Sequence, residues 1–296
     1  MQKKPAVIPL IDQINQIKRL GIMAIYSDDY LMDRLVLKGG NAIDLIYRIT
    51  TRGSRDLDFS MEKDFLPEDL PRIEAVIESN LKLTFAREKL EIFDVRFTKK
   101  PEKVDLSRDI FWGGYRVEFK VIEADKAKDL ESKRRQSVVL NESQSRIFNI
   151  DISKFEFCTG KVKRELEGLT IYVYTPEMIV FEKIRAICQQ MPEYASKKPE
   201  TATARARDFF DIYTVVDRFG IDPSSEENRA LLRNIFDAKQ VPLSLIAKIP
   251  RYREFHQGDF AAVEDTVREK EKIKTFDFYF DYVAAFCEKL KSLGDV

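Results

Sequence analysis

The sequence predicts an α+β fold over residues 1–174, with a mixed sheet and helices, followed by a helical region over residues 175–296. Before residue 175, apolar residues alternate with polar ones in several short segments, as in half-buried strands. After it they recur at three- and four-residue spacing, as in helices. Thr175, Pro176 and Glu177 mark the change, because threonine caps helices, proline suits a first helical turn and a carboxylate complements the positive helix end.

The first region combines helices with strands. Its predicted helices carry apolar residues at helical spacing and cover residues 9–26, 42–47, 67–79 and 124–135. Its predicted strands show alternation or short apolar runs and cover residues 35–37, 56–59, 81–85, 95–97, 115–121, 145–157 and 169–174. The second region is predicted to hold helices over residues 176–190, 202–218, 225–237, 259–272 and 275–292. This separation of a strand-rich part from a helical part defines the α+β class.

Composition places the chain among globular proteins without a dominant charge. Of its 296 residues, 44% are hydrophobic and 34% are charged, and 50 basic side chains balance 50 acidic ones. No overall positive field therefore points to nucleic acid. Local basic clusters are either solvated helix faces or contacts for RNA. They lie at residues 126–135, at residues 161–164, and at Lys197, Lys198, Arg205 and Arg207.

Cysteine and histidine usage argues against a zinc site and a disulfide framework. The cysteines Cys158, Cys188 and Cys287 are widely separated, and His256 is the only histidine. The first residues lack the apolar core of a secretory signal, and no apolar stretch approaches the roughly 20 residues that span a bilayer. We therefore expect a cytoplasmic protein with no membrane partner.

The segment Lys38-Gly39-Gly40-Asn41, followed by Asp56-Leu57-Asp58-Phe59, is the most informative feature of the chain. Side chains alternate along a strand, so Asp56 and Asp58 share one face, with their Cα atoms about 7 Å apart. Paired carboxylates suit hard divalent cations, which take oxygen ligands. Glycines at a helix start let phosphate groups approach backbone N–H groups. Together these features predict metal-assisted transfer from a nucleoside triphosphate.

A third carboxylate from a neighbouring strand is expected to complete a two-metal site. Asp151 lies between apolar residues in Ile147-Phe148-Asn149-Ile150-Asp151-Ile152, and a buried carboxylate requires a metal or a cationic partner. Glu118, between Val117 and Phe119, is the competing candidate, because it could equally be an exposed residue of an antiparallel pair. We favour Asp151, and the choice stays open.

Several motifs carry a family resemblance. The Gly39-Gly40 turn, the loop 51–55 and the strand Asp56-Leu57-Asp58-Phe59 resemble the core of the DNA polymerase beta-like nucleotidyltransferases. The pattern Arg-x-Ser-x-Asp-Leu-Asp-Phe over residues 52–59 is similar to that of the AbiEii/AbiGii toxins of type IV toxin–antitoxin systems, which include the MenT toxins. The resemblance spans roughly residues 35 to 215.

The second half of the chain agrees with that resemblance. The Glu-Lys-x-x-Ala segment at residues 182–186 and the Arg-Asp-x-x-Asp-hydrophobic-Tyr segment at residues 207–213 look like two further motifs of the family. Two departures stand out. The connection from Gln189 to Arg205 is longer than is usual in the family, which suggests an inserted loop, and residues beyond about 220 match nothing we can name.

The resemblance implies an Mg²⁺-dependent nucleotidyltransferase with an NTP donor and these site residues. Asp56 and Asp58 are the expected metal ligands, with Asp151 as a third and as orienter of the attacking hydroxyl. Lys183 is expected to stabilise developing charge, and one of Asp208 and Asp211 to be needed for activity. The expected contacts to the NTP phosphates come from Gly39, Gly40, Ser54, Arg52 and Lys183.

The acceptor and the partners follow from the resemblance alone. It implies an RNA acceptor, most plausibly the 3′ end of a tRNA, growth inhibition, and an antitoxin encoded nearby that need not bind stably. The rival interpretations are nucleotidyl transfer to a protein or small molecule, and a nucleotide-binding module without transfer. The sequence does not give the preferred base or the oligomeric state.

Overall fold

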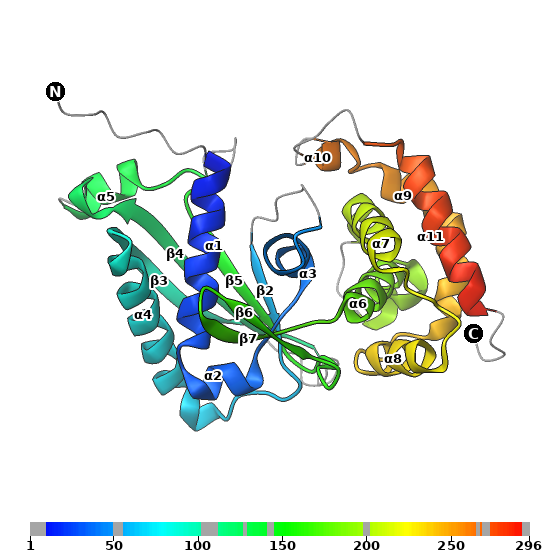
Figure 1. The fold of residues 1–296 in the computed structure, drawn as a ribbon, viewed down its shortest axis with the longest axis horizontal. Helices are drawn as coiled ribbons and strands as arrows, with labels where there is room; N and C mark the ends of the chain where they lie inside the picture. The colour runs from blue at the N-terminus through cyan, green and yellow to red at the C-terminus, as the bar shows by residue number, and fades with distance from the viewer. Residues whose placement is uncertain are drawn as a thin grey trace.

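The structure of the protein, a computed structural model, describes residues 10–49, 56–101, 112–126, 129–140, 145–197, 202–264, 267 and 273–291. The strands lie together in one half of the molecule, and the helices of the second region form the other half (Figure 1). The α+β class predicted from the sequence is confirmed. The division into domains at residues 174 and 175 stays a prediction, although the last strand ends at Val173 and the next helix begins at Pro176.

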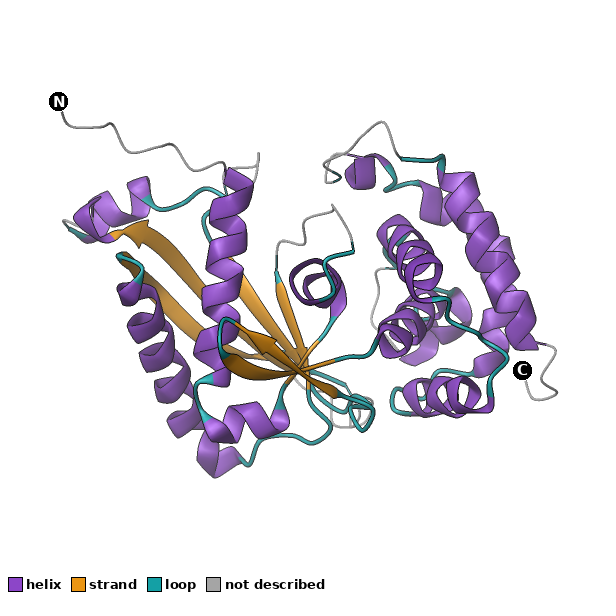
Figure 2. Ribbon diagram, viewed as in Figure 1, coloured by secondary structure: helices purple, strands orange, loops and turns teal. Residues whose placement is uncertain are grey.

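The described strands form one seven-stranded mixed sheet in the order β3-β4-β5-β2-β1-β7-β6, drawn in orange in Figure 2. Their bounds are β1 Val36–Leu37, β2 Leu57–Ser60, β3 Leu90–Lys100, β4 Gly114–Glu123, β5 Phe148–Ser153, β6 Val162–Leu166 and β7 Leu169–Val173. β1 runs parallel to β7, and β2 runs parallel to β5, while the other neighbours are antiparallel. The apolar strands β1 and β2 are therefore central to the sheet.

The register of the central strands gathers polar residues on one face. β2 pairs with β5 so that Asp58 lies beside Asp151. β4 pairs with β5 so that Arg116 lies on the other side of Asp151, and Glu118 lies beside Asn149. Because partners in register point to the same face of a sheet, these side chains share the face of Asp58.

The helices of the first region provide the packing layer of the sheet. Their bounds are α1 Leu10–Tyr26, α2 Asp29–Arg34, α3 Gly39–Asn41, a π-helical turn Ala42–Ile46, 3-10 turns Pro67–Asp69 and Ala124–Lys126, α4 Leu70–Arg87 and α5 Leu130–Gln136. α1 packs on α4 and on β2 and β7, and α4 packs on β3. α1 lies close against β2 at Gly21, where an added Cβ would lie 2.9 Å from Leu57 Cδ1.

The second region packs around α6. Its helices are α6 Pro176–Cys188, α7 Ala206–Phe219, α8 Glu226–Asp237, α9 Arg253–Gln257, α10 Ala261–Glu264 and α11 Phe276–Lys291, with 3-10 segments Pro192–Lys197 and Leu243–Tyr252. α6 contacts α7 and α8, and α11 covers α7. The predicted cap is present, because the Thr175 hydroxyl accepts a hydrogen bond from the Met178 N–H at 3.2 Å.

Three sequence-based element assignments need correction. The strand predicted over residues 81–85 is wrong, because α4 continues to Arg87. Leu81 and Phe85 follow Ile77 at four-residue spacing and are buried, whereas Leu83 is 60% exposed. β6 was not predicted, because its exposed edge carries the charged residues 163–165. The helix predicted over residues 259–272 is only α10, and residues 265–266 and 268–272 lie outside the described part of the chain.

None of the helices in the described part of the chain is long and apolar enough to cross a membrane. The longest, α4, has 18 residues and an amphipathic character, with one face buried and the other exposed.

The corrected helix gives a paired test. We expect Leu81→Ala to lower the free energy of unfolding by about 2–5 kcal/mol, because it opens a cavity in the core. Leu83→Ala should change it by no more than about 0.5 kcal/mol, as is usual for an exposed residue. Urea unfolding of both variants measures the difference. Equal losses would contradict the helical register, because Leu81 and Leu83 share a face only if the segment is a strand.

Candidate active site

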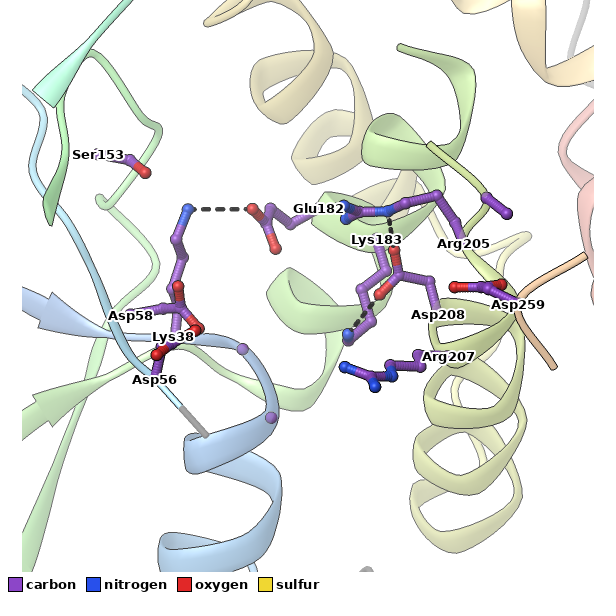
Figure 3. A pocket seen from close by; sticks show the side chains of 13 residues that line it. Lys38, Asp56, Asp58, Ser153, Glu182, Lys183, Arg205, Arg207, Asp208 and Asp259 are labelled. Atoms are coloured by element: carbon purple, nitrogen blue, oxygen red, sulfur yellow. Dashed lines mark hydrogen bonds and ion pairs between the residues drawn. The ribbon is translucent and has the colours of Figure 1, made fainter. Parts of the chain in front are cut away.

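A cavity of about 420 Å³ lies where the sheet meets the helical region. Residues from both regions line it, and Figure 3 shows them facing one another across it. They are Lys38, Gly39, Gly40, Asp56, Asp58, Ser153, Glu182, Lys183, Ala204, Arg205, Arg207, Asp208 and Asp259. The predicted site residues Gly39, Gly40, Asp56, Asp58, Lys183 and Asp208 are therefore brought together.

The sheet wall of the cavity is built by β2 and the turn after β1. The Lys38 N–H donates to the Asp58 carbonyl at 2.9 Å, which fixes the turn against the strand. Gly39 has a φ of 68°, a left-handed conformation that favours glycine. A Cβ at Gly39 would lie 3.2 Å from Asp58 Oδ2, so glycine also leaves room for that carboxylate. Asn149 Nδ2 donates to Asp56 Oδ1 at 3.1 Å and orients the second acid.

Asp58 is held in a crowded acidic environment. Burial raises its pKa to about 7, and the neighbouring acids Asp151, Glu182 and Asp56 act in the same direction, while Lys38 opposes them. A carboxylate that is costly to ionise for these reasons gains from a bound cation. The oxygen donors of Asp56 and Asp58 therefore fit a hard divalent ion.

Asp151, the predicted third metal ligand, pairs with an arginine instead of facing the cavity. Arg116 donates to both oxygens of Asp151, at 2.7 and 2.8 Å. The Asp151 side chain is 29% exposed rather than buried, and it does not line the cavity. Glu118 lies two residues beyond Arg116 along β4, beside Asn149. Within the described ranges, no three His, Cys, Asp or Glu side chains are gathered to hold an ion. The choice between Asp151 and Glu118 stays open.

Lys38 is a site residue that sequence reasoning missed. Its Nζ lies 3.1 Å from Glu182 Oε1 and 3.5 Å from Glu156 Oε1, and the residue is buried. Burial alone lowers the pKa of Lys38, but Glu156 and Glu182 outweigh it and raise the pKa above its usual value. The ammonium is therefore a permanent charge beside Asp58. Its position directly before the glycine pair was the available sequence signal.

The acids around Lys38 belong to a buried ionic network. Glu156 follows β5 and pairs with Lys38, with Arg185 of α6 at 2.8 Å, and with Lys239 after α8 at 3.5 Å. Glu156 is 6% exposed, and Arg185 and Lys239 are each 2% exposed. No sequence pattern pointed to Glu156 or Lys239, because 83 residues separate them in the sequence and only the fold joins them.

The helical wall of the cavity holds a second ionic cluster. Lys183 Nζ lies 2.7 Å from Asp208 Oδ1 and 2.8 Å from Asp211 Oδ2. Arg205 Nε donates to Asp208 Oδ2 at 2.6 Å. Burial alone raises the pKa of Asp208, but Arg205 and Lys183 outweigh it and hold the pKa far below its usual value. Both predicted acids therefore contact Lys183, which orients its ammonium.

Two predicted phosphate contacts, Arg52 and Ser54, lie outside the described residues. The remaining predicted contacts, Gly39, Gly40 and Lys183, line the cavity.

The fold agrees with what comparison finds. The family described as "Nucleotidyl transferase AbiEii toxin, Type IV TA system" matches residues 22–282. The chain belongs to this family, and it is a nucleotidyltransferase of the toxin type. The resemblance found in the sequence is thereby confirmed. Family membership implies an NTP substrate and an antitoxin partner.

The chain is similar to solved structures at low sequence identity. JHP933 from Helicobacter pylori is 16% identical with a TM-score of 0.51, over 97% of this chain and 95% of that chain. A putative nucleotidyltransferase from H. pylori is 14% identical with a TM-score of 0.48, over 97% of each chain. The antibiotic-resistance factor ANT(2'')-Ia is 13% identical with a TM-score of 0.36, over 82% of this chain and 98% of that chain. Comparison with curated proteins gives no match.

The raised pKa of Asp58 predicts a pH-dependent gain in stability for Asp58→Asn. The pKa is about 7 in the folded protein and 3.8 ordinarily, so the folded state binds the proton more tightly between these values. Its free energy of unfolding therefore falls as pH rises through this window. Without metal, Asp58→Asn should unfold at a higher temperature than the wild type at pH 8, and the difference should shrink toward pH 4.

Thermal unfolding in a metal chelator across this pH range measures the effect. Asp33→Asn, at an exposed position of α2, is the matched control and should leave stability nearly unchanged. An Asp58→Asn variant that is no more stable than the wild type at pH 8 would contradict the crowding of charge at this site.

Proposed function

We propose that the protein transfers a nucleoside monophosphate from an NTP to an RNA acceptor, the 3′ end of a tRNA, with Mg²⁺ as cofactor. The single observation that supports this most is the cavity itself. It places Asp56 and Asp58 on one wall and Lys183 on the opposite wall. Carboxylates for a metal and cations for phosphate therefore converge on one space, as phosphoryl chemistry requires.

The reaction is an in-line substitution at the α-phosphorus. The acceptor hydroxyl oxygen forms a bond to phosphorus, and the bond between the α-phosphorus and the bridging oxygen breaks. Its electron pair leaves with pyrophosphate, and the hydroxyl proton passes to a carboxylate oxygen or to water. Asp56 and Asp58 would hold Mg²⁺, with Asp151 or Glu118 as a third ligand. Bound Mg²⁺ would neutralise the charge of the phosphates.

The other residues of the cavity position the donor. Backbone N–H groups at Gly39 and Gly40, where α3 begins, would bind phosphate oxygens. Lys183 would stabilise the charge that develops on the phosphates during transfer. Asp208 and Asp211 keep its ammonium in place, which gives both acids a role without direct contact to substrate. Ser54 and Arg52 are proposed as further phosphate contacts from the loop that precedes β2.

The proposal extends to the setting of the reaction. A toxin of this kind would act in the cytoplasm, inhibit growth through modified tRNA, and be neutralised by an antitoxin encoded beside it. A stable complex between the two proteins is not required for a type IV system.

Incubation of the purified protein with each of the four α-³²P-labelled NTPs, Mg²⁺ and total RNA tests the proposal. We expect labelled RNA in the tRNA size range, and loss of labelling with a chelator. Asp56→Asn should lower the rate at least about 100-fold, because it removes charge that acts on the transferred group. The half-buried position of Asp56 means that the variant should fold normally.

Labelled protein or small molecules with unlabelled RNA would overturn the acceptor while sparing nucleotidyl transfer. Bound but unreacted NTP in every mixture would overturn transfer itself. Arg218→Ala, an exposed change at the far end of α7, is the control and should leave the rate unchanged.

A further inference from the structure

The residues that line the cavity are suited to phosphate rather than to a base. Charged side chains make up nine of the thirteen residues in the lining, and the remainder are Gly39, Gly40, Ser153 and Ala204. Among these described residues there is thus no aromatic or large apolar side chain on which a base could stack. Four of the charged residues are basic and five are acidic, so the space suits a polyphosphate bound together with a divalent cation.

The helical wall presents two arginines to that space. Arg205 and Arg207 flank the first residue of α7, and both line the cavity. In Figure 3 both side chains extend from the start of α7 toward the wall that carries Lys38, Asp56 and Asp58. In the sequence these arginines group with Lys197 and Lys198 as a basic cluster that is either a solvated helix face or a contact for RNA, whereas in the fold both arginines line the cavity.

Arg205 is more exposed to solvent than Lys183, the other cation that contacts Asp208. Lys183, Asp208 and Asp211 have side-chain exposures of 8%, 9% and 1%, whereas the Arg205 side chain is 34% exposed. The Arg205 side chain donates a hydrogen bond from Nε to Asp208 Oδ2 at 2.6 Å. The remaining N–H groups of a guanidinium form a fork that matches phosphate oxygens. Asp208 therefore holds the Arg205 guanidinium through Nε, while about a third of the side chain stays exposed at the cavity that it lines.

We propose that Arg205, assisted by Arg207, recognises the β- and γ-phosphates of the donor, which leave as pyrophosphate. The inference rests on the proposed function, because the α-phosphate must lie near Asp56 and Asp58 for transfer. The phosphates beyond it can then extend across the cavity to α7. Arg205 selects triphosphates over shorter phosphates, and Asp208 is the residue that positions it.

Binding of base-free phosphates tests this assignment directly. Inorganic tripolyphosphate, pyrophosphate and orthophosphate are titrated into the wild type, Arg205→Ala, Arg205→Lys and Arg207→Ala in the presence of Mg²⁺. Arg205→Ala should weaken tripolyphosphate about 10- to 100-fold, the loss typical of a hydrogen bond between charged groups. Orthophosphate should change by less than about 3-fold, a change smaller than a lost hydrogen bond produces. Arg205→Lys should fall between, because lysine keeps the charge and loses the fork.

The outcomes separate this inference from the proposed function. A wild type that transfers nucleotide while Arg205→Ala binds tripolyphosphate normally overturns the inference alone. So does a variant that loses RNA binding but keeps tripolyphosphate affinity, because Arg205 would then serve the acceptor. Equal weakening of all three phosphates in a variant with native circular dichroism would assign Arg205 a merely structural role. A wild type that neither transfers nucleotide nor binds tripolyphosphate overturns both proposals.

Discussion

The buried ionic network around Glu156 is the interaction on which the site depends. Burying charge is costly unless each charge is paired, and here Lys38, Arg185 and Lys239 surround one carboxylate. Lys38 and Glu156 come from the sheet region, whereas Arg185 and Lys239 come from the helical region. Separation of the two regions would therefore break the ion pairs of Glu156 with Arg185 and Lys239. The same network holds Lys38 beside Asp58, so the packing of the molecule and the electrostatics of its cavity have one cause.

The two walls of the cavity have complementary roles. On the sheet wall, Asp58 is costly to ionise because it is buried among other acids, and a cation would relieve that cost. On the helical wall, Lys183 and Arg205 are held by acids behind them and face the same space. The protein thus keeps charge in place before any substrate arrives, so little reorganisation is needed during the reaction.

Local patterns predicted much of this arrangement. The alternation in Asp56-Leu57-Asp58-Phe59 was sufficient to predict a strand with two acids on one face, and the cap at Thr175 predicted where α6 begins. The length of α4 was harder to predict, because Leu81 and Phe85 are four residues apart and residues at that spacing share one face of a helix and also one face of a strand. Contacts between residues that are distant in the sequence could not be predicted. Nothing local indicates that Arg116 pairs with Asp151 or that Lys239 reaches Glu156, since sheet register and helix packing create those contacts.

The central claim is that residues of both regions act on one nucleotide. A crystal structure of the protein with Mg²⁺ and a non-hydrolysable NTP analogue tests it most directly. The claim predicts that the α-phosphate lies beside Asp56 and Asp58 while the terminal phosphates contact side chains of α6 and α7. A nucleotide bound entirely by one region, with Lys183 and Arg205 more than about 10 Å from every phosphate, would contradict it, because charge interactions are largely screened at that range.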